Sequence, residues 1–287
     1  IIRKDEINKM KYLKTGLSAI TVGALALTLG FGGESKAAEN YYYDGMTYHN
    51  SNSAYQKAKK INNSQITIKR YNYAHKTKYK AVGRVSNYDG WKGKGKESMG
   101  TGFMVDKHTF LTNGHVVDNA YGHTSKAKSI KFDLNRDGKH KAKRFDITKI
   151  DKVPYADVAI VHTKQDMSKY AKPLKLASDW RINHLKQGQN LYSLGYPWQN
   201  GNNTYAFWNK LKYLQTSSNN TEILTKDKFR AGASGSPMVD GKYRVYGLRT
   251  YGYNIWNNGN TKFAKQEVSG GEALKGYTKK YIEKRLY

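Results

Sequence analysis

From residue 79 onward the chain consists of short runs in which hydrophobic and polar residues alternate, each closed by glycine, asparagine or aspartate. Such alternation is typical of β-strands with one buried face, and the closing residues are typical of turns. Residues 102–105 and 109–112 form a predicted hairpin, and the pair Asp240-Gly241 predicts a second one between the last two strands. The further predicted strands are 130–134, 145–150, 157–162, 190–194, 222–225, 237–239 and 243–250.

Helical spacing of hydrophobic residues occurs towards the two ends of this region. Positions 54, 55, 58 and 61 predict a short helix at about 52–62, inside a polar segment, 38–78, that we interpret as an N-terminal extension or a propeptide. Positions 277, 281, 282 and 286 predict a C-terminal helix at about 277–286. Many short strands with so few helices indicate an all-β protein, made of antiparallel β-barrels or a sandwich.

The first 37 residues resemble an export signal. Met10 is followed by lysines and then by apolar and small residues at 17–31, and the small residues Ser35 and Ala37 fit a cleavage site. The residues before Met10 look like upstream coding sequence. The apolar run is shorter than the roughly 20 residues that span a bilayer, which disfavours a membrane anchor. We expect a secreted, extracellular protein that begins at Ala38.

Composition narrows the possible classes. The 287 residues contain no cysteine, which excludes a disulfide-stapled miniprotein and a zinc site built on thiolates. A secreted chain without cysteine also favours a bacterial exporter. The net charge is +28, and removing residues 1–37, with six basic and three acidic residues, leaves about +25.

The excess positive charge lies in clusters at 57–60, 76–80, 92–96, 139–144 and 279–285. A broad positive field of this kind binds polyanions such as teichoic acids, glycosaminoglycans or nucleic acid in a salt-dependent way. An equally weighted alternative is a solvated surface that favours solubility. No motif for sequence-specific nucleic-acid recognition is present, and we expect a monomer that does not insert stably into a membrane.

Ser234 is the candidate nucleophile. It lies in Gly232-Ala233-Ser234-Gly235-Ser236-Pro237, where small neighbours let a substrate carbonyl approach and a sharp turn can aim N–H groups at an oxyanion. The alternative is an ordinary Gly/Ser loop. An α/β-hydrolase elbow is excluded, because Ser236 stands where that motif requires glycine and a strand follows instead of a helix.

A serine needs a base and an orienting acid. His115 ends a hydrophobic strand and precedes two valines, whereas six of the other seven histidines lie in polar stretches and His162 ends a strand. Asp157 stands at the mouth of an apolar strand, and a strand-capping role is its alternative. Asp151 has more polar, lysine-flanked surroundings and is the weaker candidate.

Together, Thr-Asn-Gly-His115, Asp157-Val-Ala-Ile-Val and Gly-Ala-Ser234-Gly-Ser-Pro resemble the chymotrypsin-fold serine proteases. The closer resemblance is to a secreted bacterial branch with the staphylococcal glutamyl endopeptidases, the Spl proteases and the exfoliative toxins. It covers about 79–287 and implies two six-stranded β-barrels, at about 79–175 and 185–270, with the active site between them. It also implies a protease without a metal or another cofactor, acting on protein or peptide substrates.

The resemblance assigns a role to each motif residue. Ser234 is implied to attack the scissile carbonyl, His115 to transfer the proton, and Asp157 to hold the imidazole. The N–H groups of Gly232 and Ser234 are implied to bind the oxyanion. Ala233 replaces an asparagine that is frequent in this branch, and we expect it to alter the loop more than the chemistry.

The substrate pocket departs from the glutamate-specific pattern. Phe229, between Lys228 and Arg230, stands where those relatives carry a threonine, and Arg249 stands where they carry a histidine. Arg249 either pairs with an acidic P1 side chain, the interpretation we favour, or fills the pocket of a narrower or catalytically silent homologue that binds polyanions. A further alternative is a zymogen from which residues 38 to about 66 are trimmed.

One motif imitates a metal site. Residues 133–138 resemble the start of a calcium loop, but Arg144 occupies the twelfth position, where a bidentate glutamate is needed. We therefore expect a turn between two strands.

Overall fold

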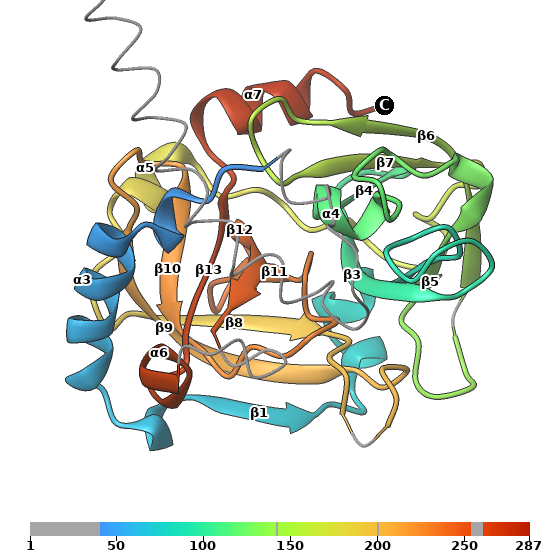
Figure 1. The fold of residues 1–287 in the computed structure, drawn as a ribbon. Coiled ribbons are helices and arrows are strands. Elements are labelled where there is room, and N and C mark those ends of the chain that lie inside the picture. The colour runs from blue at the N-terminus through green and yellow to red at the C-terminus, as the bar shows by residue number, and fades with distance from the viewer. Residues whose placement is uncertain (1–40, 142, 200, 254–260) are drawn as a thin grey trace, which may run out of the picture.

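The computed structural model describes residues 41–141, 143–199, 201–253 and 261–287. Strands dominate, and they form two antiparallel barrels that lie next to each other (Figure 1). The predicted leader and its cleavage site near Ala37 lie outside the described residues. No helix in the described ranges is long and apolar enough to cross a membrane.

The first barrel is closed, with strand order β2-β3-β4-β7-β6-β5. Its strands are β2 (Val82–Asn87), β3 (Ser98–Met104), β4 (Thr109–Thr112), β5 (Ile130–Leu134), β6 (Lys143–Lys152) and β7 (Ala159–Thr163). Phe110 and Phe132 stack inside it with ring centroids 4.1 Å apart. Gly83 makes room for this packing, because a Cβ there would lie 2.5 Å from the Phe132 ring.

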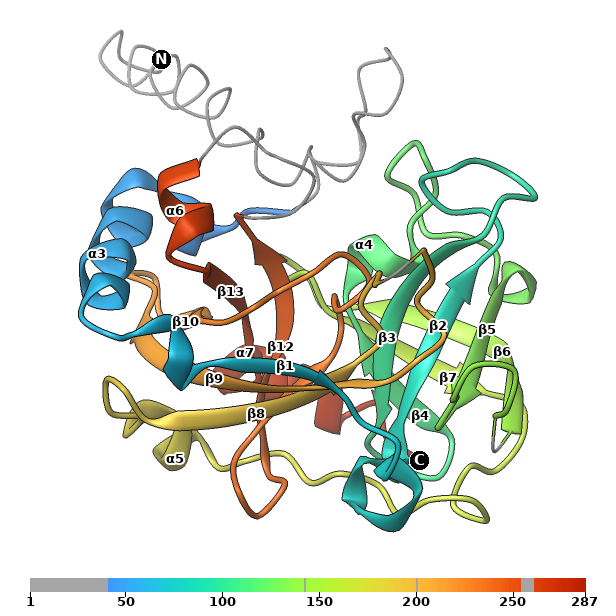
Figure 2. The same ribbon diagram turned by 90° about the horizontal axis from the view of Figure 1, so that it is seen from below.

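The second barrel is a ring of β8-β9-β10-β13-β12-β11, which closes where Val239 of β11 pairs with Tyr192 of β8. Its strands are β8 (Asn190–Gly195), β9 (Phe207–Thr216), β10 (Glu222–Lys226), β11 (Pro237–Val239), β12 (Val245–Gly252) and β13 (Val268–Ala273). A short strand, β1 (Thr67–Arg70), pairs with β9 on the outside of this ring (Figure 2).

The helices lie at the periphery. They are α3 (Tyr48–Lys59), α4 (Gly114–Val117), α5 (Asp179–Asn183), α6 (Thr261–Lys265) and α7 (Gly276–Glu283), with short 3-10 turns η2 (Asp44–Met46), η3 (Asn63–Gln65), η4 (Ala74–Lys76), η5 (Lys78–Ala81) and η6 (Ala127–Ser129). Helix α3 packs Ala54 and Ala58 against Leu214 and Leu224 of the second barrel. The buried Lys226 also donates to the carbonyl oxygens of Ala58, at 2.9 Å, and Ile61, at 2.5 Å, so the end of the helix is bound to the barrel.

The fold confirms the all-β prediction and selects barrels over a sandwich. All nine predicted strands are present, most with ends shifted by one to four residues, and the two predicted helices correspond to α3 and α7. Four strands were not predicted: β1, β2, β9 and β13. Buried polar residues interrupt the hydrophobic pattern of the last three, namely Arg84 in β2, Asn209 in β9 and Glu272 in β13.

Candidate active site

His115 and Asp157 meet at one end of the first barrel. Strand β4 leads directly into the single turn α4, which holds His115, and Asp157 precedes β7, the neighbour of β4. The His115 Nδ1 atom lies 2.6 Å from Asp157 Oδ2, and the His115 N–H donates to Asp157 Oδ1 at 2.9 Å. The imidazole side chain is 22% exposed while the carboxylate is fully buried, so part of the ring is open to solvent and its acid is not.

Each polar atom of Asp157 has a partner. Its N–H donates to Glu272 Oε1 at 3.0 Å, and its carbonyl accepts from Asn113 Nδ2 at 2.7 Å. Besides His115, the carboxylate accepts the hydroxyl of Tyr43, which lies 2.7 Å from Oδ2. A buried carboxylate is stable only when it is hydrogen-bonded, and here that condition fixes its orientation towards the imidazole.

The two pKa shifts of this pair are mutually consistent. Burial alone would raise the pKa of Asp157, but the charge and hydrogen bonds of His115 and the Tyr43 hydroxyl hold it below its usual value. Burial alone would lower the pKa of His115, but the charge of Asp157 and its hydrogen bond raise it above 6.5. The carboxylate is therefore ionised near neutral pH, and the imidazole is stabilised as its cation.

Ser234 comes from the second barrel, in the loop before β11, and is 3% exposed. Strand β3 of the first barrel binds this loop: Thr101 N–H donates to the Ser234 carbonyl at 2.8 Å, and Thr101 Oγ1 donates to the Gly232 carbonyl at 2.9 Å. The nucleophile loop thus lies against the barrel that holds His115 and Asp157.

Two glycines allow the turn around Ser234. Gly232 and Gly235 have φ of +89° and +85°, values that side chains rarely adopt. A Cβ on Gly232 would lie 2.5 Å from the Tyr196 carbonyl oxygen, and one on Gly235 would overlap the Thr101 carbonyl oxygen. Glycine is thus required here both for conformation and for space.

The predicted oxyanion donors are the N–H groups of Gly232 and Ser234. The described part of the chain offers no acceptor to the N–H of Gly232 or of Ser234. The carbonyl of Ala231 accepts from Trp198 N–H at 2.6 Å, which fixes the Ala231–Gly232 peptide and directs its N–H to the opposite side. Free backbone donors beside a serine are what a developing oxyanion requires.

The Ser234 hydroxyl has its hydrogen bond to the second barrel. Its Oγ donates to the Thr250 carbonyl oxygen at 3.2 Å, and no hydrogen bond to His115 occurs within the described ranges. Asp157 and His115 are thus hydrogen-bonded to each other, whereas Ser234 is hydrogen-bonded to Thr250. Catalytic hydrogen bonds that are absent or long in a free enzyme often form only with substrate.

The predicted pocket residues surround a buried ion pair. The Arg249 guanidinium, 2% exposed, binds Asp227 through Nε at 2.7 Å and approaches it through Nη2 at 2.6 Å. The ring of the buried Phe229 lies 5.1 Å from the guanidinium carbon. Lys228 is half-buried, with its carbonyl accepting from Asn209 Nδ2 at 3.1 Å. Arg249 is thus bound to a carboxylate of the protein itself.

The other motifs have structural roles. Asp133, in the stretch that imitates a calcium loop, accepts from Arg136 at 2.9 Å and from Arg144 at 2.7 and 2.9 Å. Three or more His, Asp or Glu side chains do not gather into a metal-binding cluster anywhere in the described ranges. His162 is buried and lies close to Asp151, with 3.6 Å between Nε2 and Oδ2.

Three residues that contact the predicted site are not evident from the sequence. Asp227 lies between two lysines, and its importance follows only from its contact with Arg249. Glu272 belongs to a Gly-rich stretch that reads as a loop, and Tyr43 belongs to the segment interpreted as an extension. No feature of the sequence around these three residues identifies their contacts.

Two barrels with a histidine–aspartate pair facing a serine loop define the trypsin-like class of peptidases. The family model described as a trypsin-like peptidase domain matches residues 100–248, more than half of the chain. The chain therefore belongs to the trypsin-like peptidase family.

Solved structures agree on the fold. A Glu endopeptidase in complex with MPD is similar with a TM-score of 0.59 at 16% identity, over 76% of this chain and 95% of that one. The VesB protease of Vibrio cholerae is similar with a TM-score of 0.56 at 14% identity, over 76% of this chain and 66% of that one. Both similarities concern the chymotrypsin-type fold.

The Arg249–Asp227 pair should control stability. Removing one partner of a buried pair leaves an uncompensated charge, so we expect Asp227→Ala to lower the free energy of unfolding by about 3–5 kcal/mol. Denaturant unfolding at neutral pH measures this loss. The matched control replaces both charges, as Asp227→Leu with Arg249→Met, and should remain close to the parent. A single variant within about 1 kcal/mol of the parent would contradict the pairing.

Proposed function

We propose that this protein is a secreted serine endopeptidase that hydrolyses peptide bonds with His115, Asp157 and Ser234 as its triad. The observation that carries the proposal is the 2.6 Å contact between His115 Nδ1 and Asp157 Oδ2, next to a serine loop with two free N–H groups. Membership of the trypsin-like peptidase family supports it. The export signal predicted from the sequence supports secretion.

The reaction would proceed in two halves. The Ser234 hydroxyl leaves the Thr250 carbonyl and attacks the scissile carbonyl carbon while neutral His115 accepts its proton through Nε2. Asp157 holds Nδ1–H and stabilises the imidazolium, and the N–H groups of Gly232 and Ser234 bind the oxyanion. His115 then protonates the leaving amine, and water repeats the sequence on the acyl-enzyme.

The nucleophile can be tested with a fluorophosphonate probe and a peptide substrate. We expect labelling at Ser234, and we expect Ser234→Ala to abolish it and to lower kcat by about 10⁴-fold or more. Ser236→Ala is the matched control, because Ser236 is in the same motif but is fully buried and donates to the Ala233 carbonyl at 2.6 Å. A folded parent that stays unlabelled would favour a catalytically silent homologue.

For the P1 side chain, we propose a preference for Glu or Asp. A guanidinium at position 249, the overall positive charge and the similarity to a Glu endopeptidase support it. The contact with Asp227 opposes it, because a substrate carboxylate must replace Asp227 as the partner of Arg249. Such an exchange adds a second carboxylate to the pocket, and the guanidinium can bind the incoming one through two N–H groups.

A peptide library with Glu, Asp, Phe or Lys at P1 tests this preference. We expect kcat/KM to be about tenfold higher for the acidic peptides, the scale that one buried polar contact supports. Replacing both pocket charges, as Asp227→Asn with Arg249→Met, should remove this difference while cleavage continues. Cleavage after Lys alone would refute the acidic preference.

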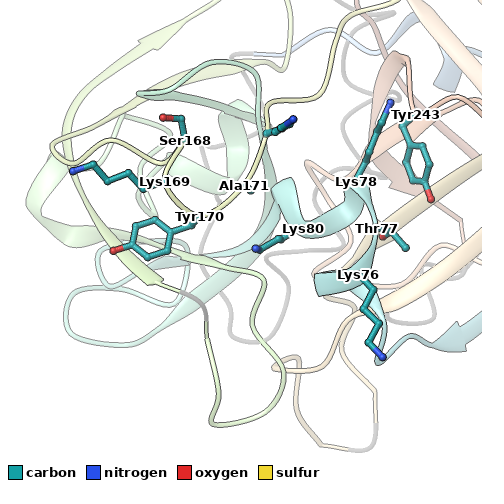
Figure 3. A pocket seen from close by; sticks show the side chains of 10 residues that line it. Lys76, Thr77, Lys78, Lys80, Ser168, Lys169, Tyr170, Ala171 and Tyr243 are labelled. Carbon is teal, nitrogen blue, oxygen red and sulfur yellow. The ribbon is translucent and has the colours of Figure 1, made fainter.

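A specific surface feature favours a second activity, the binding of polyanions. Five lysines line a hollow of about 570 Å³ without any acidic side chain: Lys76, Lys78, Lys80, Lys169 and Lys172. Figure 3 shows Lys76 and Lys78 on one side of it, Lys169 with Tyr170 on the other, and Lys80 between them. An adjoining hollow of about 710 Å³ shares Lys78 and Lys172 and adds Lys107, Lys175 and Lys242. We call the two hollows the lysine groove.

The ammonium groups of the lysine groove have no carboxylate partner in the part of the chain that the structure describes. The acidic side chains that line its second hollow are Asp106 and Glu283, and Asp106 accepts the N–H of Tyr287 at 2.6 Å. Unpaired lysines on both sides of a hollow suit a chain of phosphate or sulfate groups better than a single anion.

Binding to immobilised heparin over a salt series tests the lysine groove. We expect Lys78→Glu, Lys80→Glu and Lys172→Glu together to weaken binding at least about tenfold and to flatten the salt dependence. The matched control makes the same charge change at the exposed Lys126, Lys128 and Lys139. Equal losses in the two triple variants would show that only net charge matters and would overturn the groove assignment.

A further inference from the structure

The N-terminal segment, residues 41–50, lies across both barrels at the predicted catalytic pair. Figure 1 shows it in blue, running from α3 towards the first barrel. On that side the Tyr41 hydroxyl donates to Asp118 Oδ2 at 2.6 Å and accepts from Lys152 at 2.9 Å. A Cβ on Gly114, the neighbour of His115, would overlap the Tyr41 hydroxyl.

On the other side, the segment is bound to the second barrel. Asp44 Oδ2 accepts from Asn219 N–H at 2.8 Å and from Ser218 Oγ at 2.9 Å. Gly45 N–H donates to Glu222 Oε1 at 3.1 Å, and Asn50 Oδ1 accepts from Ser218 N–H at 3.0 Å. Asp44, Gly45 and Asn50 are buried, so these contacts are shielded from water.

Tyr43 lies between these two sets of anchors. Its ring is 6% exposed and packs 5.3 Å from the ring of Tyr251. Its hydroxyl donates to Asp157 Oδ2, the same oxygen that His115 Nδ1 approaches. The hydroxyl therefore competes with the imidazole for the charge of that oxygen and limits the positions that the oxygen can take.

We propose that Tyr43 is a positioning residue of the active site and that the segment carrying it is a permanent part of the enzyme. The proposal rests on the proposed triad and adds a fourth group that orients Asp157. It also bears on the alternative in which residues up to about 66 are removed on activation. Removal of these residues would delete Tyr43 and the contacts of Asp44, Gly45 and Asn50 with the second barrel, and should lower activity.

Tyr43→Phe tests the role while the ring stays in place. Without the hydroxyl, Oδ2 has fewer donors and binds the imidazolium more strongly, but the carboxylate is less well oriented. We expect kcat to fall about 10- to 100-fold at nearly constant KM, which is the scale of one charge-assisted hydrogen bond and well below the roughly 10⁴-fold effect of replacing the triad aspartate. Thermal unfolding should show a folded protein.

A pH titration separates positioning from general structure. We expect His115 to titrate about 0.5 to 1 pH unit higher in Tyr43→Phe than in the parent, by NMR of the ring protons and by the acid limb of kcat/KM. Glu272, Asp118 and Tyr41 also face this pair, and the substitution leaves them unchanged. The NMR titration needs no turnover, so it tests the contact even in a protein that does not cleave.

Tyr42→Phe is the matched control. Tyr42 is the neighbouring tyrosine, is 51% exposed, and makes only a 3.3 Å contact from its hydroxyl to Asp44. It should keep the parent values of kcat and of the His115 titration. A Tyr43→Phe variant that matches Tyr42→Phe in both would overturn the inference, whereas the triad proposal fails if Ser234→Ala remains active or if the folded parent stays unlabelled by the probe.

The N-terminus of the active protein gives an independent test. Mass spectrometry of the species labelled by the fluorophosphonate probe should find chains that retain Tyr43. Labelling confined to chains that begin after Tyr43 would contradict a permanent role for the segment and would support the zymogen alternative.

Discussion

The site depends on one buried negative charge. Asp157 has no exposed side-chain surface, and removing a carboxylate from water is costly unless hydrogen bonds replace its hydration. The surrounding groups supply this replacement: His115 through its ring and its N–H, and Tyr43 through its hydroxyl. The hydrogen bonds that stabilise the buried charge also orient the carboxylate towards the imidazole. The same contacts therefore serve both stability and function.

Contacts between the barrels bring this charge to the nucleophile. Asn113 of the first barrel donates to Thr250 Oγ1 of the second at 2.9 Å, and Thr101 binds the serine loop through two hydrogen bonds. Glu272 of β13 accepts the backbone N–H of Asp157 at 3.0 Å. Burial raises the pKa of Glu272 well above its usual value, so this acid can lie near Asp157 without adding a second full charge.

The sequence predicts the frame of the molecule well. The alternation of hydrophobic and polar residues and the turn residues locate most strands, and three short motifs identify the catalytic candidates. Both kinds of prediction succeed because each depends on a few consecutive residues. Three of the four missed strands, β2, β9 and β13, carry buried polar residues, such as Asn209 and Glu272, which break the hydrophobic pattern.

Local sequence patterns do not predict contacts between residues that are far apart along the chain. Arg249 is visible in the sequence as a departure from a family pattern, but its partner Asp227 is not, because the two meet only where β10 and β12 pair with the two edges of β13. Tyr43 is similar: one tyrosine in a Tyr-rich stretch differs from its neighbours only through what it contacts. The roles of Asp227 and Tyr43 follow from their contacts with residues distant in the sequence and not from their residue type.

The distances along the chain between these contacts have a consequence for how the protein matures. Tyr43 lies 114 residues before Asp157, and Gly45 lies 177 residues before Glu222. Such distant partners meet late in folding, because closing long loops costs entropy before any contact forms. The hydrogen bonds that hold Asp157 and the segment around Tyr43 would therefore be completed only after parts of both barrels had come together, so the site would form in one of the last steps of folding.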